Sequence, residues 1–134
     1  MTGATEALQT AAMTTIRGVA GFSGVYPGAP VQAVPPYALV ETGAEGDWGY
    51  KEGIGREVML TLTLRDAGES PARIYALIGS ADTALDGLAP LTDWRLVSFV
   101  FLRSRVAREG RGADSVWLAR IDYRARMIAR PGPG

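Results

Sequence analysis

The sequence predicts an α+β fold in which two main helices pack on an antiparallel or mixed sheet of four to five strands, in the order α-β-β-β-α-β-β. Two segments carry apolar residues at three- and four-residue spacing, and a third alternates apolar and polar residues. Two strand-like segments near the C-terminus flank a glycine-rich turn, which is typical of an antiparallel hairpin. At 134 residues the chain has the length of one domain, and we expect residues 1–130 to fold and 131–134 to form a flexible tail.

The first half of the chain is predicted to hold one helix and three strands. Up to the third strand we expect a helix of about 15 residues beginning near residue 4, a short strand at 24–26, an extended loop at 28–36, a strand at 37–42 and an irregular loop at 42–55. Gly18 and Gly21 end the apolar stripe of the helix. The segment 42–55 contains five glycines around Trp48 and Tyr50, which favours a loop.

The second half begins with the clearest strand. Val58, Leu60, Leu62 and Leu64 alternate with less apolar residues, which predicts one buried face over 58–65. Ser70 offers an N-cap and Pro71 a first helical position, so a second helix should run from 71 to 87. A strand at 94–106, a turn at 109–114 and a strand at 115–128 complete the predicted order.

The predicted strand at 94–106 is apolar on both faces. Strict alternation places Val97, Phe99 and Phe101 on one face and Leu96, Val100 and Leu102 on the other. A sheet with helices on one side normally has one polar face, so something must cover the second face. Either the chain itself or a neighbouring subunit would do so, and an exposed apolar patch would indicate a subunit.

Composition excludes most catalytic chemistry. The chain has no His and no Cys, which removes the usual general base, thiolate nucleophiles and most transition-metal ligands. Gly53-Ile54-Gly55 begins like a dinucleotide fingerprint but lacks the third glycine and leads into a strand. The acids around the glycine-rich loop have no calcium-loop spacing. We therefore expect no cofactor and no metal site, although paired carboxylates would still permit a hydrolase.

The uncharged run from 18 to 40 contains four prolines, so it cannot form a continuous membrane helix. The N-terminus lacks the pattern of an export signal, and we expect a soluble protein made in the cytoplasm.

The 14 basic and 14 acidic side chains are unevenly distributed. Residues 1–93 carry five basic groups against eleven acids, whereas 94–134 carry nine Arg against three acids. The two halves either cancel in the fold or steer a charged partner, including a second copy of the chain. Alternate residues of the last strand place Arg120, Arg124 and Arg126 on one face, which is either solvated or an interface for acids or phosphates.

Aromatic residues in the glycine-rich loop are the second candidate for a contact surface. Trp48 and Tyr50 either fold back as a lid on the sheet or anchor a partner, as Trp and Tyr often do at interfaces. The residues expected at a partner or subunit interface are Trp48, Tyr50, Lys51, Ile54, Arg103, Arg105, Arg120, Arg124 and Arg126.

Nearly the whole chain resembles the tail-terminator, or tail-completion, proteins of long-tailed bacteriophages and phage-like gene transfer particles. After the N-terminal helix, the resemblance rests on VYP at 25–27, PYALVE at 36–41, the loop with Trp48, EVMLTL at 57–62, IYAL at 74–77 and YRAR at 123–126. It implies a structural protein without catalytic residues. Family members form a ring, commonly a hexamer, that caps the tail tube, stops its polymerisation and joins the head connector.

The resemblance also implies partners and a location. The partners would be further copies of the chain, the tail-tube protein and the head–tail connector protein, with DNA passing through the lumen but no sequence-specific nucleic-acid binding and no membrane. The location would be the head-proximal end of a virion tail, assembled in the bacterial host cytoplasm. Two alternatives stay open: another connector ring component, and a small ligand-binding or carboxylate-dependent enzyme domain.

Overall fold

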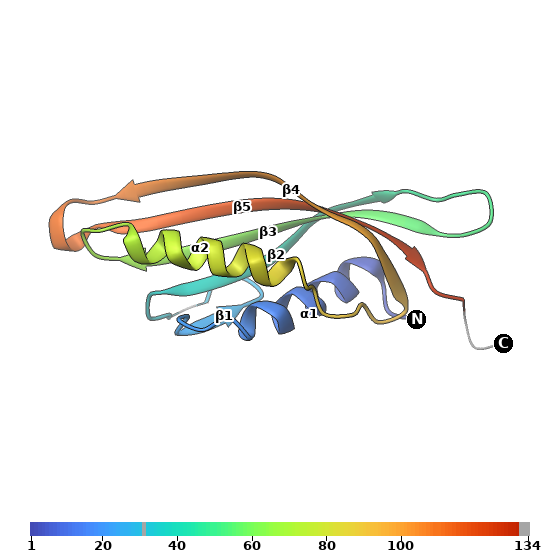
Figure 1. Cartoon of the computed structure of the whole chain (residues 1–134), viewed down its shortest axis with the longest axis horizontal. Helices are drawn as coiled ribbons and strands as arrows, with labels where there is room; N and C mark the ends of the chain where they lie inside the picture. The colour runs from blue at the N-terminus through green and yellow to red at the C-terminus, as the bar shows by residue number, and fades with distance from the viewer. Residues whose placement is uncertain (31, 132–134) are drawn as a thin grey trace.

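The computed structural model describes residues 1–30 and 32–131, so most of the tail predicted to be flexible lies outside the described residues. Two helices and a five-stranded sheet form the fold (Figure 1). The elements are α1 (Ala4–Arg17), β1 (Gly24–Tyr26), β2 (Tyr37–Asp47), β3 (Gly55–Ala67), α2 (Ala72–Leu85), β4 (Trp94–Glu109), a short 3-10 helix η1 (Gly112–Asp114) and β5 (Val116–Ala129). The predicted fold class and element order are confirmed.

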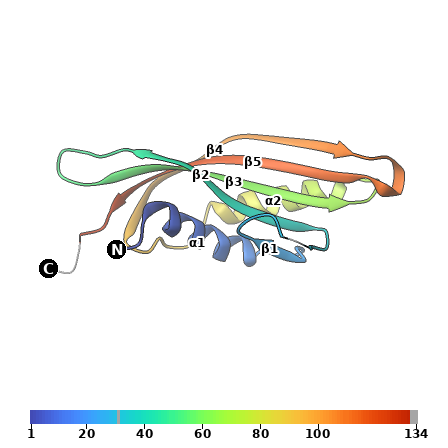
Figure 2. The same ribbon diagram turned by 180° about the vertical axis from the view of Figure 1, so that it is seen from behind.

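The strands lie in the order β1-β2-β3-β5-β4. The short β1 runs parallel to β2, and every other neighbouring pair is antiparallel. Both helices lie on one side of the sheet, which leaves the other side free of helices (Figures 1 and 2). The β2–β3 and β4–β5 hairpins project at opposite ends of the molecule (Figure 2).

The core lies between the helices and the covered face of the sheet. Leu8 and Ile16 of α1 and Ile74 of α2 are fully buried. Val58, Leu60, Leu62 and Leu64 are at most 1% exposed, so the predicted face of β3 is confirmed. Each such side chain contributes roughly 1.5–3 kcal/mol when it leaves water.

The segment 42–55 is less irregular than predicted. β2 continues to Asp47 and β3 begins at Gly55, so only 48–54 lies outside the strands. A register shift after Thr42 accommodates the glycines, and pairing resumes at Glu45 opposite Val58. Glycines and acids hide the strand pattern in the sequence, whereas pairing with β3 supplies the backbone hydrogen bonds that form the strand.

The predicted faces of the strand at 94–106 are wrong in part. β4 has register shifts between Leu96 and Ser98 and between Phe101 and Arg103. Each shift adds a residue without a cross-strand partner and resets the alternation. Phe99 and Phe101 therefore share the helix side with Leu96, opposite Ala125, Tyr123 and Met127 of β5.

The second helix begins at Ala72, one residue later than expected. The hydroxyl of Ser70 still accepts a hydrogen bond from the Ala72 backbone N–H, at 3.1 Å. Arg73, in the first turn, pairs with the buried carboxylate of Asp66 and holds its pKa below the usual value; the backbone N–H of Ala67 acts in the same direction and burial opposes both.

Candidate functional site

Arginine side chains gather on the helix-free face of β4 and β5. Residues opposite each other in an antiparallel pair share a face, and Arg105 lies opposite Arg120 while Arg103 lies opposite Asp122. Arg124 and Arg126 occupy the next alternate positions of β5. The five arginines predicted from the sequence are thus together on one surface, which we call the arginine face: Arg103, Arg105, Arg120, Arg124 and Arg126.

Asp122 forms ion pairs with two arginines at one end of the arginine face. It is 6% exposed, and its carboxylate lies 2.9 Å from Arg103 Nε and 3.5 Å from Arg120 Nε. The hydroxyl of Thr61 donates to it at 2.7 Å. Burial raises the pKa of Asp122, but the Thr61 hydrogen bond and the two guanidinium groups more than offset burial, so the pKa lies below the usual value.

In the middle of the arginine face, one hydrogen-bond donor has no acceptor. The Nε atom of Arg124 is buried and has no hydrogen-bond partner among the described residues. Its cross-strand neighbours, Met59 on β3 and Val100 on β4, offer no acceptor side chain. A buried guanidinium N–H without an acceptor lowers the stability of the fold.

Arg126 joins the arginine face to the β2–β3 hairpin. Its guanidinium lies 2.9 Å from the Glu57 carboxylate and 5.6 Å from the centre of the Trp48 ring. Trp48 is half-buried and, through this contact, lies on the helix-free side. Trp48 thus packs against Arg126, and its role as a partner contact stays a prediction.

The side chains at the end of the hairpin are exposed to solvent. Tyr50 and Ile54 are 50% and 49% exposed, and Lys51 is exposed. A Cβ at Gly55 would overlap the carbonyl of Trp48, so this position requires glycine to close the hairpin. We call residues 48–54 the hairpin tip. It and the arginine face together contain all nine residues predicted as interface residues, which stay a prediction.

The edge strand β4 carries exposed apolar side chains, on both of its faces, that the site prediction left out. Val97, Val100 and Phe101 are 45%, 37% and 51% exposed. β4 pairs only with β5, so its other edge has no partner strand in the described chain. The sequence signal was the apolar residues on both faces, for which a neighbouring subunit was one of two interpretations, but the residues were not assigned to the site.

The acids near the hairpin are divided between different parts of the molecule. Glu57 pairs with Arg126 on the helix-free side, whereas Asp47 lies 3.4 Å from Arg56. Across residues 1–30 and 32–131, no three acids lie together as metal ligands would. Asp47 and Glu57 are therefore held in separate ion pairs, while Glu41 and Glu45 line an open groove on another part of β2.

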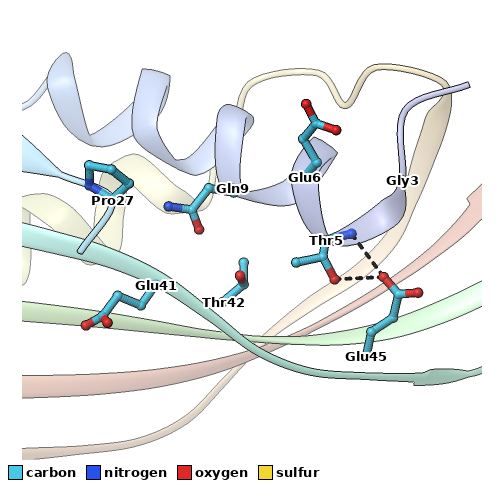
Figure 3. Close-up of a pocket in the computed structure, with 8 residues that line it drawn as sticks. All are labelled: Gly3, Thr5, Glu6, Gln9, Pro27, Glu41, Thr42 and Glu45. Atoms are coloured by element: carbon cyan, nitrogen blue, oxygen red, sulfur yellow. Dashed lines mark hydrogen bonds between the residues drawn. The ribbon is translucent and has the colours of Figure 1, made fainter.

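An open groove lies between α1 and β2 on the opposite edge of the sheet (Figure 3). The hydroxyl and backbone N–H of Thr5 donate to Glu45, and Gln9 donates to the Val40 carbonyl at 2.5 Å. Glu6 and Glu41 also line the groove. Sequence reasoning missed this site because α1 and β2 meet only in the tertiary structure.

Residues 5–128 match the model of the family described as Tail completion protein gp17. The chain belongs to this family. It is therefore a structural component of a phage-type tail, and its place is the virion. No curated protein matches the sequence.

One solved structure, a chain of the virion of a native gene transfer agent particle, has a TM-score of 0.63 and 23% identity to this chain. The alignment covers 91% of this chain and 95% of that chain, and it shows a shared fold. Among the described residues, no helix is long and apolar enough to cross a membrane.

Proposed function

We propose that this tail completion protein forms a ring that caps the tail tube, stops its polymerisation and joins the tail to the head connector. Six subunits per ring is what the family resemblance implies. The ring would act through its surfaces alone, with no catalytic group and no cofactor, at the head-proximal end of the tail.

The open edge of β4 is the observation that carries the proposal of a ring. Soluble monomers normally avoid exposed apolar residues on an edge strand, because such an edge can associate with another chain. Val97, Val100 and Phe101 break that rule on a 16-residue strand. A contact between this edge and a different surface of the next copy is heterologous, and such contacts close into a ring when the rotation between copies permits.

The projecting hairpin supports contact with the tail tube. Its tip extends away from the helices and carries the exposed side chains of Tyr50 and Ile54 (Figure 1). Exposed Tyr side chains on projecting loops contribute strongly to binding. We assign the hairpin tip to the tube and the arginine face to a neighbouring subunit, where acidic groups would meet the exposed side chains of Arg103, Arg105 and Arg120; passing DNA is the alternative contact for this face.

Mass measurement with and without polymerised tail-tube protein tests the proposal. We expect a ring of defined subunit number at tube ends and an arrest of tube growth. A chain that stays monomeric and never binds tube ends would contradict it. Binding to the head connector without any binding to tube ends would instead favour the alternative of a neighbouring connector ring component.

A further inference from the structure

We propose that the open edge of β4 docks into the groove between α1 and β2 of a second copy of this chain. The inference rests on the proposed ring and names the two surfaces that form its repeated contact. One surface is the part of β4 from Val100 to Arg105, and the other is the groove around Glu6, Glu41 and Glu45.

The two surfaces lie on opposite edges of one sheet. β4 is the last strand on one side, and on the other side β1 covers only 37–39 of β2. Residues 40–47 of β2 therefore have no strand partner on their outer edge within the described chain. A contact that joins opposite edges cannot be satisfied within one molecule or by a twofold pair, so it must repeat from copy to copy.

The strand directions allow β4 of one copy to lie antiparallel to β2 of the next copy. Because β2, β3, β5 and β4 alternate in direction, β4 runs opposite to β2. A neighbour related by rotation about a ring axis would place its β2 antiparallel to β4. Gln9 and the register shift after Thr42 partly occupy the β2 edge, so we assign the contact to side chains in the groove and not to an unbroken ladder.

Opposite charges on β4 and on the groove favour contact between these two surfaces. Arg103 and Arg105 are exposed on β4, and Arg105 forms no ion pair with any described residue. Glu41 lies opposite Thr61 and so shares the helix-free face with Arg105, and the carboxylates of Glu41 and Glu6 are likewise without an ion pair in the described chain. Opposite charges favour this docking, whereas two β4 edges would place arginines against each other.

Charge reversal at the two surfaces tests the inference. Arg105→Glu would place a carboxylate against the acidic groove, and Glu41→Lys would place an ammonium group against the basic edge. Each variant should weaken ring formation at tube ends by about tenfold or more, because like charges at an interface cost several kcal/mol. Their melting temperatures should stay close to wild type, since both side chains are exposed.

Combination of the two reversals gives the decisive result. A chain with both changes, and a mixture of the two single variants, should recover ring formation to within about threefold of wild type, because opposite charges face each other again. In the mixture the variants must alternate, so recovery requires an even number of subunits. Arg17→Glu and Glu69→Lys are matched controls at exposed positions away from both surfaces.

The outcomes separate the inference from the proposed ring. Wild-type rings that are insensitive to both single reversals would overturn the docking while leaving the ring intact. Single reversals that weaken assembly without recovery in the double variant would also overturn it, because the two residues would then contact other groups. A wild-type chain that never forms rings would overturn both proposals.

Discussion

The helix-covered and helix-free faces of the sheet are built from the same strands but have different physical roles. On β3, Leu60, Leu62 and Leu64 face the helices, while Thr61 lies between them and binds Asp122 on the opposite face. The period of two lets one strand fill a core and at the same time present a charged surface. Stability should therefore depend mainly on the first face and assembly on the second.

The largest effect should come from the covered face. Leu62→Ala removes a side chain that is 1% exposed and should lower the free energy of unfolding by about 2–5 kcal/mol. Chemical denaturation measures this change. Thr63→Ala, on the helix-free face of the same strand, is the matched control and should cost only about 0.5 kcal/mol. Equal losses for the two variants would contradict the division between faces.

Asp122 is the exception that sharpens the comparison, because it is a buried charge on the helix-free face. Asp122→Asn removes its two ion pairs and weakens the Thr61 hydrogen bond, so we expect a loss of about 1–3 kcal/mol at pH 7. Glu109→Gln, at the exposed end of β4, serves as the control and should be nearly neutral. A neutral Asp122→Asn would show that the face contributes nothing to folding.

The same variant should alter the pH dependence of stability. The pKa of Asp122 is lowered in the folded chain, so its contribution is complete above the unfolded pKa of about 3.9 and is lost as the pH falls through the lower folded pKa. Unfolding curves from pH 7 to pH 2 should therefore converge for wild type and Asp122→Asn at the acid end. If the difference in free energy of unfolding between the two proteins stays constant with pH, the effect comes from packing and not from the charge of Asp122.

A smaller effect is expected at the hairpin tip. Trp48→Ala removes the contact with Arg126 and should cost about 0.5–1 kcal/mol of folding stability. The affinity for tube ends should fall by more than this stability loss accounts for, because the proposal assigns the hairpin tip to the contact with the tube. A loss of stability as large as that of Leu62→Ala would mean that Trp48 is a structural lid and not a partner contact.

The smallest effect on stability should come from Arg124. Because its Nε has no partner, Arg124→Met should leave the free energy of unfolding within about 1 kcal/mol of wild type or raise it. Arg126→Met, which loses Glu57 and Trp48, is the matched control and should be less stable. If Arg124→Met nevertheless weakens ring formation, the arginine face is an interface; unchanged assembly would exclude Arg124 from it.

Much of this molecule was predictable from local pattern. The 3.6-residue stripes predicted α1 and α2, and strict alternation predicted the buried face of β3 and the arginine face of β5. These features are local, because the residues that share a face are fixed by the geometry of a single element. The missing His and Cys, and the resemblance over the whole chain, pointed to a structural protein.

Tertiary pairing decided the rest. The two register shifts of β4 moved Phe99 and Phe101 to the helix side, and pairing with β3 extended β2 to Asp47 through glycines that predict a loop. The groove between α1 and β2 joins residues about forty positions apart. Backbone hydrogen bonds between strands and contacts between distant elements depend on the whole fold, so no single segment of sequence carries them.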